Sequence, residues 1–259
     1  MRLAIFGDVH GNLPGLEAAW RTLSSEGFDL ALCTGDLVQY GPWPNEVVSF
    51  FVEHDVACVQ GNCDRAVGRS RRETGDDFPN AHWKALACRA LEWTSDIIEE
   101  RSRKYLRDLP EELRFAVGRR EILLTHGLPG RATVGFEHDT PGESADLLLQ
   151  SASVSLMILG HTHSPLLVTR ERGWIVNPGS VGGGSLPGAG TAALVEMDER
   201  KERMSVAFYR VSWDRERYVR EYERAGLPDI FLRCLLLGRD PRGRWHTEDH
   251  RWRQRWAER

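Results

Sequence analysis

Two histidines lie on either side of a threonine in the stretch ILGHTHSP, residues 158–165, directly after an aliphatic run and a glycine. Side chains at positions i and i+2 point to the same side of an extended backbone. If the backbone stays extended here, His161 and His163 can bind one ligand together, or two neighbouring ligands. The pair therefore predicts a binding site just beyond the end of a buried strand.

Four further apolar runs end beside a glycine and a potential metal ligand, as this one does. They are RLAIF, LALCT, VACVQ and EILLT, followed by Gly-Asp, Gly-Asp, Gly-Asn and His-Gly. A single Gly-Asp or Gly-Asn pair usually marks a turn, and a single histidine is usually a hydrogen-bonded polar group. One metal centre explains all five run ends together, and it has seven predicted ligands: Asp8, His10, Asp36, Asn62, His126, His161 and His163.

Seven ligands are more than one tetrahedral zinc ion needs, so the set indicates a centre with two metal ions. Asp36 is the natural shared ligand, because a carboxylate has two oxygens. Two cations about 3.5–4 Å apart can hold both the attacking and the leaving oxygen in phosphoryl displacement. Oxygen and nitrogen donors without cysteine suit manganese, which we favour, or iron, nickel, cobalt or zinc, more than calcium or magnesium. We expect Asp36, Asn62 and His126 to be the catalytic residues.

The runs that carry these ligands are typical of strands buried on both faces, because they are short, aliphatic and bounded by glycine. Residues 13–26 and 43–54, between the first three runs, have apolar side chains at helical spacing. This strand–helix–strand alternation predicts βαβ units. Ligands in open α/β sheets lie beyond the carboxyl ends of the strands, so we expect the five strand ends to bring all seven side chains to one rim.

A long insert interrupts this alternation after the stretch GNCD. Residues 65–79 are polar, and a helix-rich segment follows them. Asn80 or a neighbour is expected to cap a first helix, and Thr94 or Ser95 a second. The 65–110 insert is either a lid or substrate wall beside the site, or a helical elaboration packed on the side of the domain.

The last third of the chain changes pattern. After His163 the apolar residues alternate as they do in antiparallel strands. The glycine-rich stretch 179–190 lacks the Lys-Ser/Thr pair of a P-loop, and we interpret it as a flexible loop. Residues 212–259 are expected to form a helical extension. The end of this extension has a tryptophan stripe formed by Trp245, Trp252 and Trp256. The stripe predicts packing on the domain or on a second copy, with nucleic-acid binding as the alternative.

Length, charge and composition limit the classes of protein to which the chain can belong. The chain has 259 residues and a formal net charge of −4, which argues against a generic polyanion binder. No run approaches the roughly 18 apolar residues of a membrane span, and the first residues are typical of a strand, not of a signal peptide. Five scattered cysteines argue against a disulfide framework. We therefore expect a cytoplasmic protein that is a single domain, residues 1–259.

The stretches GDVHGN, GDLVQYGP, GNCD, THG and GHTH, in this order, resemble the five sequence blocks of the calcineurin-like metallophosphoesterase superfamily. The resemblance extends from Met1 to about Val211, and the stretch NPGSVG resembles its bacterial and archaeal phosphodiesterase-like branch. It implies an α/β fold, a four-layer α/β/β/α sandwich of two mixed β-sheets. It also implies a dinuclear centre, with Asp8, His10, Asp36 and His163 on the first metal ion and Asp36, Asn62, His126 and His161 on the second.

The activity that the resemblance implies is hydrolysis of a phosphate ester, above all a phosphodiester, by in-line attack of a metal-bridging hydroxide. Alternatives on the same fold are a phosphomonoesterase, a dinucleoside polyphosphate hydrolase, and a binding scaffold without turnover. Scaffolds tend to lose ligands, and all seven are present here. We expect a small phosphate ester as the substrate, with nucleic acid left open, and a homodimer as one candidate assembly.

Three residues in or next to the blocks are predicted to contact the substrate. Asn12 ends the block GDVHGN and Arg65 directly follows GNCD, and arginine suits phosphate through its planar fork. Cys63 stands where many relatives read GNHE, with a histidine that is thought to protonate the leaving group. A thiol is a poor match for that role near metal ions, which favours substrates with good leaving groups such as activated diesters. The alternatives are a solvated Arg65 and a Cys63 that only fills space.

Overall fold

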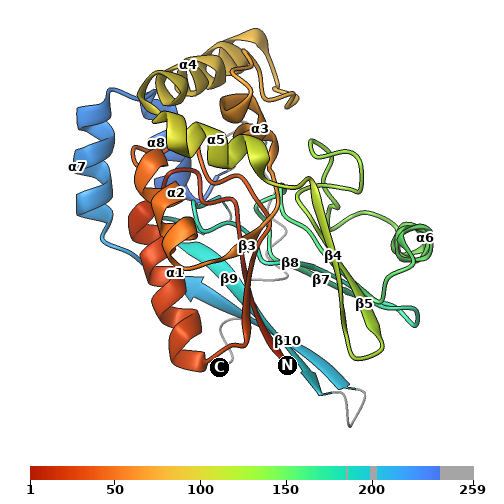
Figure 1. The fold of residues 1–259 in the computed structure, drawn as a ribbon. Coiled ribbons are helices and arrows are strands. Elements are labelled where there is room, and N and C mark those ends of the chain that lie inside the picture. Colours follow the sequence, from red (N-terminus) through yellow and green to blue (C-terminus); the bar gives the residue numbers. More distant parts are fainter. Residues whose placement is uncertain (185, 199–202, 240–259) are drawn as a thin grey trace.

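The computed structural model describes residues 1–184, 186–198 and 203–239. These residues contain ten strands: β1 (Arg2–Phe6), β2 (Leu30–Cys33), β3 (Ala57–Cys58), β4 (Glu112–Val117), β5 (Arg120–Thr125), β6 (Leu156–Ile158), β7 (Leu166–Thr169), β8 (Trp174–Asn177), β9 (Gly190–Asp198) and β10 (Arg203–Val211). One sheet has the order β10-β9-β1-β2-β3 and the other β4-β5-β6-β8-β7 (Figure 1). Both sheets mix parallel and antiparallel pairs. All five ligand-bearing runs are strands, as predicted, although β3 is only two residues long.

The helices cover the outer faces of the two sheets (Figure 1). The one that packs outside the second sheet is α6 (Gly142–Ala152), whereas the others lie on the side of the first sheet or at its end. Those are α1 (Leu13–Glu26), α2 (Pro44–Glu53), α3 (Asn62–Gly68), α4 (Ala81–Ile97), α5 (Glu100–Asp108), α7 (Arg215–Ala225) and α8 (Asp229–Leu237).

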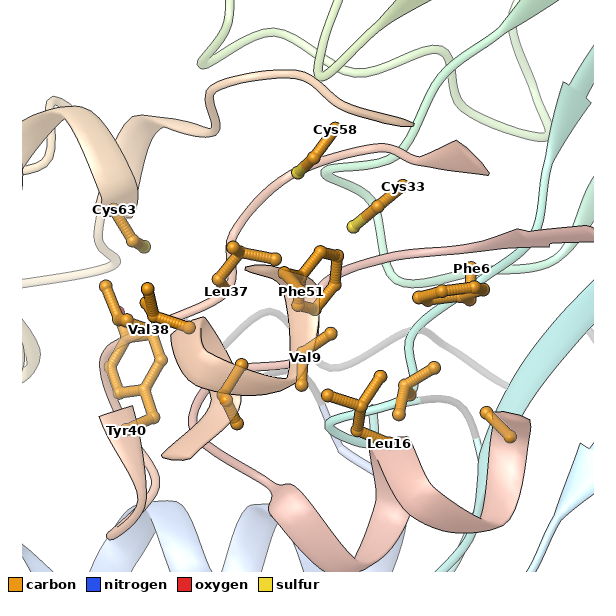
Figure 2. Close-up of a cluster of buried hydrophobic side chains, with 14 of the residues drawn as sticks. Phe6, Val9, Leu16, Cys33, Leu37, Val38, Tyr40, Phe51, Cys58 and Cys63 are labelled. Atoms are coloured by element: carbon orange, nitrogen blue, oxygen red, sulfur yellow. The ribbon is translucent and has the colours of Figure 1, made fainter. Parts of the chain in front are cut away.

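Side chains that alternate along the strands build three separate apolar layers. Leu3 of β1 and Ile122 of β5 belong to the layer between the sheets. Phe6 of β1 faces the opposite way, into the layer beneath α1 and α2, where Figure 2 shows it near Leu16 and Phe51. Leu149 of α6 packs on the outer face of the second sheet. The four-layer α/β/β/α sandwich is thereby confirmed.

The insert after α3 forms two helices, with one of the predicted boundaries corrected. Asn80 caps α4, because its side chain accepts a hydrogen bond from Trp83 N at 3.0 Å. Thr94 and Ser95 do not cap a helix. They lie inside α4, where Thr94 Oγ1 donates to the Ala90 carbonyl at 2.9 Å, and α5 starts after Glu99 instead. A buried threonine can satisfy its hydroxyl within the helix, so the helix continues through it.

The antiparallel hairpins and the loop expected after His163 are present in the described residues. The hairpins β7–β8 and β9–β10 are antiparallel, and the described part of residues 179–190 is a loop that leads into β9. All five cysteines are free. None of the described helices is long and apolar enough to cross a membrane. The tryptophan stripe Trp245, Trp252 and Trp256 lies outside the described residues.

Candidate metal centre

The predicted ligands follow strands of both sheets. Asp8, Asp36 and Asn62 follow β1, β2 and β3, whereas His126 and His161 follow β5 and β6 of the other sheet. Contacts between side chains and the backbone link the two sets of strand ends. The His126 ring lies 2.7 Å from the carbonyl of Thr34, which comes directly after β2. The site therefore lies between the carboxyl ends of two facing sheets.

Close approach of the two sheets requires glycine at position 160. A Cβ atom on Gly160 would lie 2.5 Å from Thr34 Oγ1 and 2.7 Å from Asp8 Oδ2, which is closer than real Cβ atoms come. The His161 amide donates a hydrogen bond to Asp8 Oδ2 at 3.2 Å. Asp8, which follows a strand of the first sheet, is thus hydrogen-bonded to the backbone of His161, which follows a strand of the second sheet.

Five of the seven predicted ligands have a left-handed backbone, with φ from +48° to +67°: Asp8, His10, Asp36, His161 and His163. The condition of an extended backbone at His161 and His163 is therefore not met. Their rings nevertheless reach one cavity, whose lining includes both. Left-handed conformations cost free energy for residues other than glycine, and they concentrate at functional sites where the surrounding fold imposes them.

The first group of donor atoms belongs to Asp8, His10 and His163, which all lie within 4.8 Å of one another. His10 Nε2 lies 3.0 Å from His163 Nε2, and His163 Nε2 lies 3.4 Å from Asp8 Oδ1. Asp8 Oδ1 is buried and accepts no hydrogen bond from the described residues. A buried carboxylate oxygen in this state is costly unless a cation is bound to it.

The second group is arranged around His126. Its Nε2 lies 3.4 Å from Asp36 Oδ2 and 3.0 Å from Asn62 Oδ1, and its ring lies edge-on to that of His161 at 5.2 Å between centroids. Asp36 connects the two groups, because its Oδ2 is also 3.9 Å from His10 Nε2. Asp36 thus lies between His10 of the first group and His126 of the second.

Lone pairs meet within the second group, and this decides whether the group suits a cation. His10 Nδ1 and His126 Nδ1 lie 3.3 Å and 2.7 Å from the carbonyls of Val38 and Thr34. Carbonyl oxygens only accept, so both rings donate from Nδ1 and direct Nε2 into the site. His126 Nε2 and Asn62 Oδ1 then face each other at 3.0 Å, and they repel unless a proton or a metal ion lies between them. These residues therefore fit divalent metal ions.

The charges in the site differ between the two groups. Burial, followed by the neighbouring His163, lowers the pKa of His10 to about 4. Burial acts in the same direction on His126, but Asp36 outweighs it and raises the pKa of His126 to about 10. Burial also opposes ionisation of Asp36, and His126 nevertheless holds the pKa of this carboxyl well below its usual range. The metal-free site therefore keeps a second proton on His126, on Nε2, at neutral pH.

Binding of Mn²⁺ to the metal-stripped protein is expected to release protons at neutral pH. His126, with a pKa of about 10, must give up its proton to become a ligand, whereas His10, with a pKa of about 4, is already neutral. Calorimetric titration in two buffers of different ionisation enthalpy counts these protons, and we expect on the order of one per chain. The affinity for Mn²⁺ should rise with pH until His126 loses its proton. A count of zero would contradict a protonated His126.

The three predicted substrate contacts have different surroundings. Cys63 is buried beside Asp36 and His10, and burial followed by Asp36 raises the pKa of the Cys63 thiol well above its ordinary value. Asn12 is fully buried and caps α1 by accepting from Gly15 N at 2.9 Å. Arg65 is half-buried on α3, and its side chain makes no ion pair with the described residues. Cys63 is the one that lines the cavity of the cluster.

Sequence reasoning missed two buried carboxylates of the site. Asp64 accepts from Leu37 N at 2.8 Å and Gly61 N at 3.0 Å, and burial followed by Asp36 raises the pKa of Asp64 to about 7. Its place three residues after the cap of α3 is the signal that identifies it. Asp76 lines the cavity from the polar segment between α3 and α4, and no local pattern distinguishes it from the exposed Asp77.

Comparison with known proteins agrees with this geometry. The family model of the calcineurin-like phosphoesterase superfamily domain matches residues 1–200. Phosphodiesterase YfcE of Escherichia coli is 26% identical over 76% of this chain and 86% of its own length. The uncharacterized protein MJ0912 of Methanocaldococcus jannaschii is 25% identical over 92% of this chain and 98% of its own.

A solved structure extends the comparison to the fold. The metallophosphoesterase from Sphaerobacter thermophilus is 27% identical, covers 92% of this chain and 99% of its own, and superposes with a TM-score of 0.69. The family match covers the strands and loops that carry all seven predicted ligands. The chain therefore belongs to the calcineurin-like phosphoesterase superfamily, and it is a metal-dependent phosphoester hydrolase.

Proposed function

We propose that the protein is a phosphodiesterase with a dinuclear metal centre, in which Asp36 is the ligand shared by both ions. The observation that carries the proposal is the overlap of three donor groups at one place: Asp8 with His10 and His163, His10 with Asp36 and Cys63, and Asp8 with Asp36 and His126. Two divalent ions held there would supply a water of lowered pKa and neutralise charge on the phosphoryl oxygens. Manganese is the ion we favour for this mixed oxygen and nitrogen donor set.

The charges around the cavity favour a diester over a monoester. The described residues that line it are His10, Asp36, Tyr40, Cys63, Asp76, His161 and His163, with no lysine or arginine among them. At neutral pH a phosphomonoester carries about two negative charges, as a phosphorylated side chain does, and a diester carries one fewer. A site that adds carboxylates and no basic side chain suits the less charged ester. The buried Cys63 thiol, with its raised pKa, is a weak acid, which also favours good leaving groups.

An adjoining hollow offers a place for an ester group. It begins at His10 and His163 and continues between Tyr40, Phe231 and Leu235. At about 30 Å³ it holds roughly two water-sized groups, so the bulk of a larger alcohol would remain outside. Its walls are mainly apolar and aromatic, and Arg239 adds one basic side chain to them. The apolar part of the wall suits an uncharged ester substituent.

Turnover of paired chromogenic substrates tests the proposal. Bis-p-nitrophenyl phosphate and p-nitrophenyl phosphate share one leaving group, so their kcat/KM values compare diester with monoester directly. With Mn²⁺ added to the metal-stripped protein, we expect turnover of the diester with kcat/KM higher by about tenfold or more. Preference for the monoester, or for a dinucleoside polyphosphate offered as a third substrate, would replace the proposed specificity. No turnover of any of them would leave a binding scaffold.

A further inference from the structure

Asp76 lies in the polar segment between α3 and α4, outside every sequence block, yet its carboxylate reaches the predicted ligands. Its side chain is only 5% exposed, and Oδ1 lies 4.0 Å from His161 Nε2. Oδ2 accepts a hydrogen bond from Asn62 Nδ2 at 3.0 Å and another from Thr74 Oγ1 at 2.7 Å. A buried carboxylate with these two donors is held in place from its own segment and from α3.

The contact with Asp76 decides which end of the Asn62 amide faces the cluster. A carboxylate only accepts hydrogen bonds, so the group of Asn62 that faces Asp76 must be the NH₂. The carbonyl Oδ1 is then the end that faces His126 Nε2 at 3.0 Å. With the amide turned by half a rotation, NH₂ would face His126, and an amide NH₂ has no lone pair to offer a metal ion.

We propose that Asp76 is a positioning residue for metal binding, which orients Asn62 so that Oδ1 faces the ion site shared with His126. This inference rests on the proposed function, because it assumes that metal ions bind at the cluster. Partners that orient metal ligands typically contribute 10–100-fold to metal affinity. Thr74 donates to the same oxygen, Oδ2, as Asn62 does, so Asp76 cannot turn this oxygen away from Asn62 without losing a second hydrogen bond.

The 65–110 insert then supplies an orienting carboxylate to the cluster, a role that is neither that of a lid or substrate wall nor that of a purely structural elaboration. Helix α4 packs against the core through Ala87, Ala90 and Leu91, as an elaboration would. The segment before it carries Thr74 and Asp76 to the cluster. Packing of α4 therefore fixes the end of the segment that supplies the orienting carboxylate.

Calorimetric titration of metal-stripped protein with Mn²⁺ tests the role of Asp76 without measuring turnover. Asp76→Ala is expected to weaken one of two Mn²⁺ sites by about 10–100-fold and to leave the other within about threefold. Asp76→Asn keeps a carbonyl that can accept from Asn62, so a smaller loss at the same site is expected. Asp77→Asn is the matched control, because it removes the neighbouring exposed carboxylate, and wild-type affinity at both sites is expected.

The outcomes separate this inference from the proposed function. If wild type takes up two Mn²⁺ ions and Asp76→Ala binds them equally well, or weakens both sites alike, the positioning role is wrong and the metal centre stands. If wild type binds no Mn²⁺, the proposed function itself fails. Should Asp76→Ala not fold, Thr74→Val removes only the hydroxyl that supports the carboxylate. We then expect a several-fold loss confined to one site, and unchanged affinity would overturn the inference.

Discussion

Asp36→Asn is expected to lower kcat/KM for a phosphodiester by about 10³-fold, measured with bis-p-nitrophenyl phosphate at saturating Mn²⁺. Asp36 Oδ2 lies 3.4 Å from His126 Nε2 and 3.9 Å from His10 Nε2, so this carboxylate belongs to both donor groups. An amide has no charge and only one oxygen, and it cannot serve two ions. Asparagine keeps the volume of aspartate and tolerates the left-handed backbone at this position, where φ is +53°, so the loss should come from the carboxylate alone.

Asp55→Asn is the matched control for this prediction. Asp55 also has a left-handed backbone, with φ +49°, but it is exposed at the end of α2. The same exchange there is expected to leave kcat/KM within about twofold of wild type, because surface substitutions usually change little. Retention of full activity in Asp36→Asn would contradict its place as the shared ligand.

Gly61→Ala is expected to impair both stability and activity. A Cβ atom on Gly61 would overlap the carboxylate oxygen Oδ1 and the backbone nitrogen of Asp36. The backbone of Gly61 is extended, with φ −77° and ψ 171°, so alanine is allowed there and the overlap alone causes the effect. Overpacking of this kind costs about 1–3 kcal/mol, and a shift of about 1 Å in a ligand can lower activity by roughly 10²-fold. Urea unfolding of the metal-stripped protein and kcat/KM measure the two effects.

Gly130→Ala separates crowding from backbone strain. Gly130 has φ +69°, and nothing lies within 4 Å of the Cβ it would gain. We expect a loss of about 1–2 kcal/mol in the free energy of unfolding from the left-handed conformation alone, with activity unchanged. Wild-type activity in Gly61→Ala would show that Asp36 can move away from the new methyl group without consequence.

Local sequence patterns predicted the strands and the candidate ligands, because each strand is one apolar run and the candidate ligands follow directly after these runs along the chain. Aliphatic runs ending in glycine mark buried strands wherever they occur, and the polar residues after them must lie at strand ends. The helix over residues 13–26 was predictable for the same reason, since its apolar spacing is continuous. Helix α1 has the predicted bounds, Leu13–Glu26. The residue types of the candidate centre were therefore available before the fold.

Features that depend on distant contacts were not available from the sequence. Nothing in the run TAALVEMDERK indicates that β9 pairs with β1. Likewise, nothing in the runs of β5 and β6 indicates that they lie in a different sheet from β1. The left-handed conformation of His161 accompanies the hydrogen bond from its amide to Asp8, 153 positions away. Asp76 is equally hidden, because its partner Asn62 is reached only after the chain has turned back on itself.

Positive φ angles restrict which substitutions the candidate centre accepts at five of its positions: Asp8, His10, Asp36, His161 and His163. A residue introduced at any of the five positions must satisfy the torsional preference as well as the coordination chemistry. Aspartate, asparagine, histidine and glycine are the residues that enter this region most readily, whereas β-branched side chains are penalised. Libraries aimed at a new metal preference should therefore concentrate on Asn62 and His126, the two predicted ligands whose torsion angles are ordinary.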